Sequence, residues 1–506
     1  MDVLAQLAHG FGVAMQPGNL YVCLIGVLVG TLVGVLPGLG PVASMALLLP
    51  LTYSLGPTAA LIMFAGIYYG AMYGGSTTSI LLNIPGEAAS VMTCVDGYVM
   101  ARQGRAGAAL GIAAFGSFIA GTVAIAGLTL IANPLASFAL KFSYPEYVAL
   151  MVLGLMLVVV LASGSLLKAF AVLGVGLVLS SIGQDVVSGM FRFTYGVPTL
   201  MDGFDLGPMI MGLFGVSEVL ANIGSPAERV VVRTRIRDLL PTKEDWKRSA
   251  GAILRGTGLG FLLGALPGGG AIVSSFASYA VEKRISLHPE QFGKGAIEGV
   301  AGPESANNAA SIGSFVPLLT FGIPSNITMA IVMGALMING VTPGPTLITE
   351  RPDLFWGVIA SMYIGNAVLL ILNLPLIGIW IQVLKVPYRV LFPLILIFCA
   401  VGSFSMNNSL FDVYMMTVFG VIGYLMKRNG YEPAVLVLAF VIGPILEQSL
   451  RQSLLLGEGS FAIFVTRPIS ATLIAVAALL VVSSAIPVIA KRRRAMVEAA
   501  IESNPN

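Results

Sequence analysis

Long runs of apolar residues without a single charge are the dominant pattern along this chain. Three of them, Leu354–Leu384, Val390–Phe411 and Ile469–Ala490, contain no Asp, Glu, Lys or Arg. About 20 apolar residues are enough for a helix to cross the hydrocarbon core of a bilayer. In lipid the backbone polar groups of such a segment must be satisfied internally, which favours helices. The pattern therefore predicts an all-α polytopic membrane protein with roughly 10 to 14 membrane segments.

Composition indicates the same class of protein. Hydrophobic residues make up 57% of the 506 residues, charged residues only 10%, and the mean hydropathy is +0.91. Soluble chains carry about 25% charged residues, so most of this surface must face lipid. The N-terminus, Met-Asp-Val-Leu, lacks the basic stretch of a cleaved secretory signal. We therefore expect the first apolar segment to remain in the mature protein.

The placement of basic residues predicts which loops are cytoplasmic, because Lys and Arg near span ends favour that side. The C-terminal cluster Lys491–Arg494 places the C-terminus inside, and Arg229–Arg255, with eight basic and three acidic residues, is also cytoplasmic. The loops with Arg102 and Arg105, and with Lys427 and Arg428, belong to the same side. Counting spans between these loops gives a consistent topology. The four spans expected between Arg105 and Arg229 are Ala108–Ala139, Tyr147–Ala162, Leu167–Gly183 and Gly207–Gly224.

Two motifs rich in Gly and Pro occur twice in the chain. Gly34–Gly40 reads GVLPGLG and Gly264–Gly270 reads GALPGGG, 230 residues further on. Asn83–Gly86 reads NIPG and Gly322–Ser325 reads GIPS, 239 residues further on. Such self-similarity indicates an internal repeat.

The charges around the motifs predict that the two repeats have opposite orientations in the membrane. In the first copy the loop Ser54–Pro57 between the motifs is neutral, and Arg102 and Arg105 follow the second motif. In the second copy the basic residues lie between the motifs, in Glu282–Lys294, and the segment Gly340–Pro352 after them is nearly neutral. Inverted repeats of this kind enclose the substrate sites of many secondary transporters. Two parallel repeats are the alternative.

These features divide the chain into six parts. We expect a first repeat core at 1–107, four membrane helices at 108–228, a cytoplasmic basic segment at 229–255, a second repeat core at 256–353, C-terminal membrane helices at 354–490 and a cytoplasmic tail at 491–506.

Gly and Pro inside apolar segments predict broken or re-entrant helices that line a binding site. Interrupted helices at membrane depth are tolerated where they line a cavity, and their N-terminal N–H groups attract anions. A kink or a tight helix contact is the alternative for any one motif. The predicted substrate-binding residues are Pro37, Gly38, Gly40, Ser76, Thr77, Asn83, Pro85 and Gly86 in the first copy, and Pro267, Gly268, Gly269, Gly270, Ser305, Asn307, Asn308, Pro324 and Ser325 in the second.

Glu298 and Glu304 flank the second copy of this region. Glu304 follows Pro303, so it either stabilises a helix start or binds a coupling cation or proton, as intramembrane carboxylates often do. Glu298 is a second candidate for cation coupling. We interpret Arg255, Asp96 and Glu87 as interfacial or structural groups.

Other classes of function find little support in the sequence. The chain has no phosphate-binding loop of the Gly-x-x-x-x-Gly-Lys-Ser/Thr type, so we do not expect an ATP-driven pump. Cys23, Cys94 and Cys399 are scattered, and His9 and His288 lack ligand spacing, so we expect no metal site, no catalytic residues and no enzyme activity. A passive anion channel for organic acids stays open as an alternative to a transporter.

Several longer segments resemble one known family. The chain contains Gly299–Ala310 (GVAGPESANNAA), Pro317–Pro324 (PLLTFGIP), Leu36–Gly40 (LPGLG), Leu266–Ala271 (LPGGGA) and Ala101–Gly107 (ARQGRAG). Together they resemble the signature of the large membrane subunit of tripartite tricarboxylate transporters, the TctA family. The similarity extends from about residue 20 to residue 480.

This resemblance implies a permease of the bacterial inner membrane that works with a periplasmic solute-binding protein and a small four-helix membrane subunit. It implies symport of small di- or tricarboxylates with a cation, Na⁺ or H⁺, without ATP hydrolysis and without a cofactor. The expected partners are these proteins, the substrate and membrane lipid, and not nucleic acid. One position departs from the family pattern: Ser325 stands where Gly is usual, so it either adds a hydrogen bond to the ligand or narrows the pocket.

Overall fold

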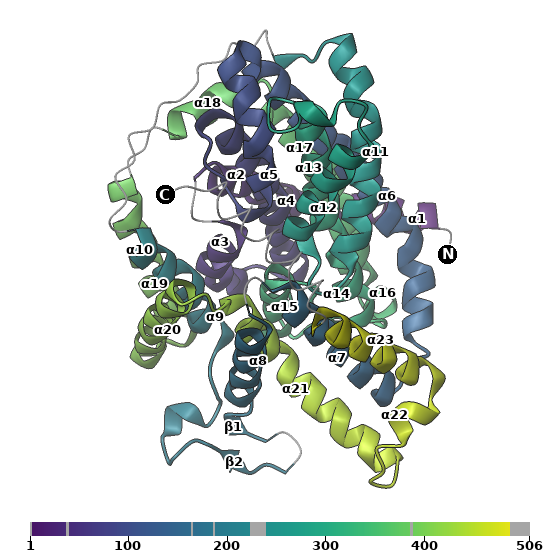
Figure 1. The fold of residues 1–506 in the computed structure, drawn as a ribbon. Coiled ribbons are helices and arrows are strands. Elements are labelled where there is room, and N and C mark those ends of the chain that lie inside the picture. The colour runs from purple at the N-terminus through teal and green to yellow at the C-terminus, as the bar shows by residue number, and fades with distance from the viewer. Residues whose placement is uncertain are drawn as a thin grey trace.

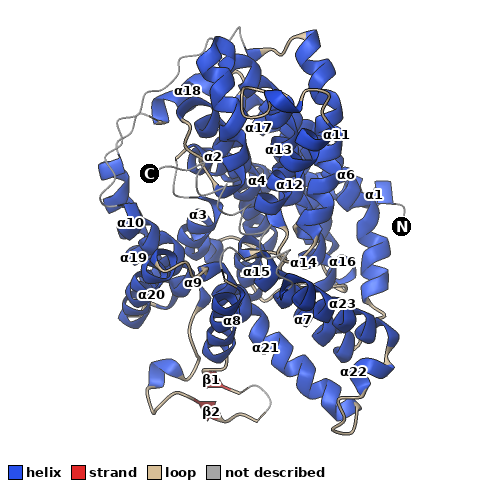
Figure 2. Ribbon diagram, in the orientation of Figure 1, coloured by secondary structure: helices blue, strands red, loops and turns tan. Residues whose placement is uncertain are grey.

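The computed structural model describes residues 3–36, 40–162, 165–185, 188–222, 239–384 and 388–485. Helices make up nearly all of this part of the chain (Figures 1 and 2). The described strands form one small hairpin, β1 (Gly183–Gln184) with β2 (Phe191–Arg192), at the lower end of Figure 1. Six described helices are long and apolar enough to cross a membrane, and seven more are shorter and apolar. The predicted all-α polytopic membrane fold is confirmed.

The first repeat consists of helices separated by the two predicted breaks. Helix α2 (Pro17–Val35) ends at the second residue of the first motif, and α3 (Gly40–Leu48) starts at its last residue. After a 3₁₀ turn, α4 (Pro57–Leu82) leads to the second motif. The chain then resumes with the turn Ala88–Ser90 and α5 (Val91–Thr93).

The second repeat has the same order of helices and breaks. Helix α11 (Lys243–Ala265) likewise ends at the second residue of the first motif, and α12 (Gly270–Ile285) starts at its last residue. Helices α13 (Glu298–Gly313) and α14 (Phe315–Phe321) lead to the second motif, after which α15 (Ile327–Ile338) begins.

Small residues hold equivalent helix pairs together within each repeat. A methyl group on Gly26 or Gly30 of α2 would lie 2.6 Å from a backbone oxygen of α4. The equivalent glycines of α11, Gly256 and Gly260, are as close to backbone oxygens of α13, at 2.4 and 2.2 Å. The two pairs of glycines are separated by the same 230 residues as the first motif. Glycines spaced four apart allow such close contact between membrane helices.

The two central helices, α4 and α13, run in opposite directions. Ser76, near the end of α4, contacts Glu304 in the first half of α13, with 2.5 Å between Oγ and Oε2. Tyr68, two turns earlier in α4, instead packs against Phe315 just after α13, with ring centroids 6.5 Å apart. Because α2 lies parallel to α4 and α11 parallel to α13, the two repeats are inverted relative to each other, as the charge pattern predicted.

The remaining described helices surround this pair of repeats (Figure 1). They are α1 (Val3–Ala14), α6 (Ala106–Ala139), α7 (Tyr144–Leu161), α8 (Leu166–Ser180), α9 (Leu206–Ile210), α10 (Ser217–Asn222), α16 (Leu347–Glu350), α17 (Pro352–Asn373), α18 (Ile377–Val383), α19 (Tyr388–Asn407), α20 (Leu410–Arg428), α21 (Pro433–Leu456), α22 (Ile463–Thr466) and α23 (Pro468–Ala485).

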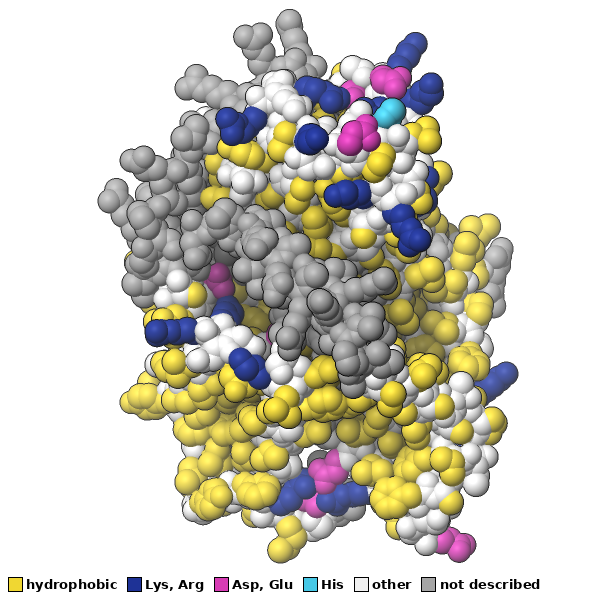
Figure 3. All heavy atoms as spheres, viewed as in Figure 1, with side chains coloured by type: hydrophobic (Ala, Val, Ile, Leu, Met, Phe, Trp, Pro, Cys, Tyr) yellow, Lys and Arg dark blue, Asp and Glu magenta, His cyan; other side chains and the backbone are white. Residues whose placement is uncertain are grey.

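The surface agrees with a position in a bilayer. On the face shown in Figure 3, hydrophobic side chains predominate below the grey residues, charged side chains gather at the upper end, a few Lys and Arg lie at mid-height on the left, and a smaller charged group lies at the lower end. In the lower part, Arg192 of β2 pairs with Glu447 of α21, and Arg451 of α21 pairs with Asp185 next to β1, so the two ion pairs join the hairpin to α21. A wide apolar band between two charged ends is typical of a membrane protein.

Two parts of the sequence analysis need comment. Helix α11 starts at Lys243, where Thr242 and Asp245 form a capping box, so the second half of the segment 229–255 is helical. A Thr followed three residues later by Asp supplies partners for the first N–H groups and starts the helix there. The cluster Lys491–Arg494 and most of 229–242 lie outside the described residues.

Candidate functional site

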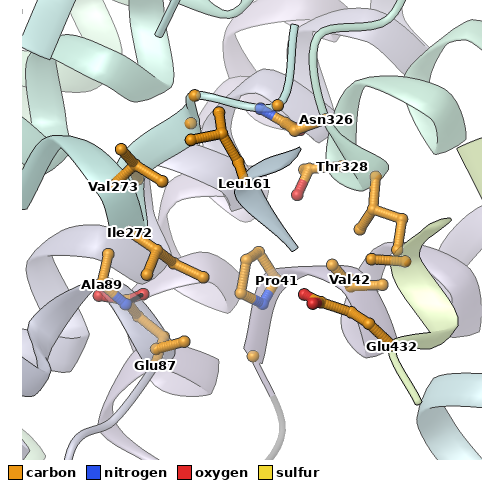
Figure 4. Close-up of a pocket in the computed structure, with 18 of the residues that line it drawn as sticks. Pro41, Val42, Glu87, Ala89, Leu161, Ile272, Val273, Asn326, Thr328 and Glu432 are labelled. Carbon is orange, nitrogen blue, oxygen red and sulfur yellow. Dashed lines mark hydrogen bonds between the residues drawn. The ribbon is translucent and has the colours of Figure 1, made fainter. Parts of the chain in front are cut away.

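The breaks of both repeats meet at one cavity of about 580 Å³ (Figure 4). Residues on its wall from the first repeat are Gly40, Pro41, Val42, Tyr68, Met72, Pro85, Gly86, Glu87, Ala88 and Ala89; those from the second are Gly268, Gly269, Gly270, Ala271, Ile272, Val273, Asn326, Ile327 and Thr328. Helices α7, α10 and α21 and the turn before α10 complete the wall. The cavity therefore lies between the inverted repeats.

Four helices begin at this cavity. Helix α3 starts at Gly40, α12 at Gly270, α15 at Ile327 and α21 at Pro433, each with its first residues or its cap on the wall. The first N–H groups of a helix have no partner within the helix. Together with the helix dipole they favour a negatively charged ligand.

Equivalent residues of the two repeats have the same unusual backbone conformation. Gly40 and Gly270, which begin α3 and α12, both have φ near +60°. Asn83 and Gly322, which end α4 and α14, have φ of 58° and 71°. This left-handed conformation is accessible mainly to Gly and Asn. The motifs thus stop one helix and redirect the chain in both copies.

The wall also carries three carboxylates. Glu87, Glu218 and Glu432 line the cavity, and no Lys or Arg is among the described lining residues. Glu432 precedes α21, and its side chain lies beside Pro41 and Val42 in Figure 4. Glu218 forms an ion pair with Lys427 over 2.7 Å. Our interpretation of Glu87 as an interfacial or structural group was incomplete, because its side chain is buried on the cavity wall.

Asn326 connects the two repeats at the cavity. Its Oδ1 accepts a hydrogen bond from the Met329 backbone N–H over 3.0 Å and so caps α15. Its Nδ2 donates to Ser314 Oγ and to the Tyr68 hydroxyl, at 2.9 and 3.2 Å. Neither Asn326 nor Thr328 was among the predicted site residues. Asn is a favoured N-cap residue, and Asn326 stands directly before an apolar helical run, so the sequence did contain a signal for it.

A second group of predicted residues lies apart from the cavity wall, around Glu304. The Glu304 Oε2 accepts hydrogen bonds from Ser76 Oγ at 2.5 Å and from Asn307 Nδ2 at 3.2 Å, and Oε1 accepts one from Thr93 Oγ1. All of these side chains are buried. Of the two interpretations of Glu304, the one in which it stabilises a helix start is wrong. Helix α13 begins six residues earlier, at Glu298, so Glu304 lies inside the helix.

Asn308 extends this polar group towards α6. Its Nδ2 donates to Ser117 Oγ at 2.7 Å and to Asn307 Oδ1 at 2.6 Å. Ser305 is also fully buried, and its hydroxyl has no hydrogen-bond partner within the described structure.

Glu298 occupies a different environment from Glu304. Its two carboxylate oxygens accept hydrogen bonds from Arg248 Nε and Nη2, both at 2.8 Å. This bidentate pair satisfies the carboxylate.

The predicted site residues thus fall into three sets. Gly40, Pro85, Gly86, Gly268, Gly269 and Gly270 line the cavity, whereas Ser76, Thr77, Asn83, Pro267, Ser305, Asn307, Asn308, Pro324 and Ser325 do not, and Pro37 and Gly38 lie outside the described residues. The Ser325 hydroxyl donates to the Ser314 carbonyl oxygen over 3.2 Å. The Ser325 side chain therefore stabilises the break between α14 and α15. This contact differs from the two roles expected for it, a hydrogen bond to the ligand or a narrower pocket.

Comparison with known proteins identifies the family. Residues 20–438 match the model of the Tripartite tricarboxylate transporter TctA family. The chain belongs to the TctA family. The matched region includes both repeats and nearly all of the cavity wall. The transporter family also agrees with the expectation that the chain is not an enzyme.

Two proteins of Agrobacterium vitis are similar to this TctA chain. The "Uncharacterized 52.8 kDa protein in TAR-I ttuC' 3'region" is 53% identical over 493 residues, which are 97% of this chain and 98% of that protein. The "Uncharacterized protein in TAR-II ttuC' 3'region" is 55% identical over 234 residues, 46% of this chain and 97% of that protein. No solved structure matches the chain.

Proposed function

We propose that this TctA protein is the permease subunit of a binding-protein-dependent secondary transporter that imports small di- or tricarboxylates. The observation that carries the proposal is the convergence of four helix N-termini on one cavity between inverted repeats. Broken helices at a repeat interface are how secondary transporters bind anionic substrates near the middle of the membrane.

The size and walls of the cavity support a small anion as substrate. Its volume of about 580 Å³ lies within the range of about 300–1,000 Å³ found for small-molecule sites. Asn326 and Thr328 on one wall provide polar side-chain groups beside the start of α15. The N–H groups at the helix starts and the Thr328 hydroxyl can bind carboxylate oxygens without a fixed basic residue.

The carboxylates on the wall support a cation gradient as the driving force. Glu218 is paired with Lys427, but an anion beside Glu87 and Glu432 meets like charges, which oppose its binding. A cation that enters with the anion, Na⁺ or H⁺, compensates this charge. Binding of the two is then mutually favourable, which is the thermodynamic requirement for symport.

The family supports the assignment of partners and location. We infer a periplasmic solute-binding protein that delivers the substrate and a small membrane subunit, since the family is named for a tripartite system. We place the chain in the bacterial inner membrane with its C-terminus in the cytoplasm, because the basic loops then follow the positive-inside rule.

The proposal is tested by flux into proteoliposomes that contain the chain with its small subunit and binding protein. Radiolabelled citrate, succinate, malate and tartrate are supplied one at a time, with a Na⁺ gradient, a pH gradient or neither. We expect at least one substrate to accumulate above its external concentration, only with an ion gradient and the binding protein. Equilibration without accumulation would instead identify a passive channel.

A further inference from the structure

Glu304 is a buried carboxyl group that only neutral side chains contact. It lies between the two central helices of the repeats, and Ser76, Thr93 and Asn307 supply its hydrogen bonds. Several other buried carboxylates have a basic partner, such as Glu146, which pairs with Arg467 over 2.6 Å. Among the described residues, neither a Lys, an Arg nor a backbone N–H contacts the Glu304 carboxyl. Without such a partner, transfer from water disfavours the charged form.

The hydrogen bonds of Ser76 also fit a proton on Glu304. The Ser76 hydroxyl lies 3.2 Å from the Met72 carbonyl oxygen and 2.5 Å from Glu304 Oε2. A hydroxyl has one proton to donate. When Ser76 donates this proton to the Met72 carbonyl oxygen, the hydrogen bond between Ser76 and Glu304 needs a proton on the Glu304 carboxyl group.

Glu87 provides a second carboxyl group, at the cavity. It is only 8% exposed and lines the wall. Its Oε2 accepts a hydrogen bond from the Ala89 N–H over 2.6 Å, and its Oε1 has no hydrogen-bond partner within the described structure. A buried carboxylate oxygen without a donor is costly unless it binds a proton or another cation.

Two pairs of hydroxyl groups lie between these carboxyl groups. The Ser90 hydroxyl donates to the backbone oxygen of Glu87 over 2.8 Å and accepts a hydrogen bond from the Ser79 hydroxyl over 2.9 Å. Ser76 and Thr93, which bind Glu304, are three residues from Ser79 and Ser90 respectively. Residues three apart lie on the same helix face, with Cβ atoms about 5–6 Å apart. One hydroxyl rotation or one bridging water molecule spans such a gap.

Other titratable groups of the described residues lie near this path. Cys94 lies beside it, and Tyr68 of α4 lies close enough to interact with Glu87. The Arg255–Glu282 pair of α11 and α12 lies next to α13 at Gly302. Tyr279 of α12 and Asp96 of the first repeat lie next to it at Gly299, and both positions precede Glu304. Helix α6, which also packs against α13, has no Asp, Glu, Lys or Arg.

We propose that the coupling cation is a proton, which Glu87 receives at the cavity and Glu304 holds between the repeats. This inference rests on the proposed function and names its cation. A hydronium ion in the cavity gives one proton to Glu87 and leaves a water molecule. Transfer along the hydroxyl groups then neutralises Glu304 and returns Glu87 to its ionised form. The proton taken up removes one negative charge from the Glu87 and Glu304 pair, which favours the substrate anion, so proton and anion are carried together.

The donors at Glu304 favour a proton over Na⁺. A sodium ion needs several oxygen ligands, whereas Asn307 presents its NH₂ group to Glu304. The orientation of that amide is supported by its Oδ1, which accepts a hydrogen bond from Asn308 over 2.6 Å. Two hydroxyl groups and an amide nitrogen around one carboxyl group suit an exchangeable proton better than a metal ion.

The test measures substrate uptake and internal pH together, in the same three-component proteoliposomes. For the wild type we expect a pH gradient in Na⁺-free buffer to drive accumulation, with acidification of the lumen. Glu304→Gln resembles the protonated side chain permanently. It should lose accumulation and acidification but still exchange labelled for unlabelled substrate across the membrane.

Two further variants make the result specific. Glu146→Gln changes a buried carboxylate that pairs with Arg467, so proton influx per substrate should equal that of the wild type. Glu87→Gln should lose accumulation and acidification in the same way as Glu304→Gln. If Glu304→Gln does not insert into the membrane, Glu87→Gln alone tests whether these carboxyl groups carry the coupled proton. A Na⁺ gradient that drives accumulation without lumen acidification would overturn the proton as the coupling cation but would leave the proposed transporter function standing. Absence of accumulation with every gradient and substrate would overturn the proposed function itself.

Discussion

The backbone N–H of Gly268 donates a hydrogen bond to the carbonyl oxygen of Ser325 over 2.7 Å. These residues belong to the two separate breaks of the second repeat. The bond therefore fixes the distance between the start of α12 and the segment that leads into α15. In the first repeat the corresponding breaks also touch, because a methyl group on Gly86 would lie 2.0 Å from the Gly34 carbonyl oxygen. Contact between the two breaks is thus a common feature of both halves.

Substitution of Gly268 should abolish uptake. Its φ is +80°, and a Cβ atom would lie 2.9 Å from the backbone nitrogen of Val158 in α7. Gly268→Val therefore adds backbone strain and a clash, and costs about 1–3 kcal/mol or more. Uptake and membrane content are measured together. Gly174→Val, where a Cβ meets no atom within 4 Å, is the control and should transport normally. Full uptake by Gly268→Val would contradict the role of this break.

Two glycines of α11 should respond oppositely to the same change. A methyl group on Gly260 would lie 2.2 Å from the Ala306 oxygen, whereas one on Gly258 would meet nothing within 4 Å. Gly260→Ala should therefore separate α11 from α13 and lower stability by about 1–3 kcal/mol. Gly258→Ala should leave the stability equal or raise it by up to about 1 kcal/mol. Thermal unfolding of the two purified variants in detergent makes the comparison, and equal melting temperatures would refute the tight contact.

A negative charge at Asn326 should weaken binding of the substrate. Asn326→Asp keeps an oxygen that can cap α15 but places a further carboxylate at the cavity. At about 4 Å and an effective dielectric constant of about 20, two like charges repel by about 4 kcal/mol. We expect the apparent affinity for the anion to fall by about tenfold or more. Asn326→Ser retains a capping oxygen without the charge and is the matched control. Equal affinities of the two variants would show that the anion binds elsewhere.

The inverted orientation predicts labelling from opposite sides. Ser54 lies between the motifs of the first repeat and Glu290 between those of the second, and both side chains are exposed. Single cysteines at these positions should react with a membrane-impermeant maleimide from opposite faces of the membrane. Cys23, Cys94 and Cys399 are buried, so the background should be low. Labelling of both positions from one face would exclude inverted insertion.

The sequence by itself determined the class of protein, the repeat and where its helices break. These properties are local. A run of apolar residues settles that a segment belongs in lipid, and Asn83 or Gly322 ends a helix because few residues adopt a left-handed backbone. Repetition of the same local signals in the same order, 230 and 239 residues further on, was enough to identify the two halves.

Only the tertiary structure decided which residues share a site. Glu432 and Asn326 reach the cavity because α21 and α15 begin there, and no motif marks either of them as a neighbour of Glu87. Glu304 has Pro303 before it, as a helix start often does, yet it lies inside α13 and contacts residues of the other repeat. Such contacts depend on how distant helices pack, and side-chain spacing along one segment carries no information about its partners in another.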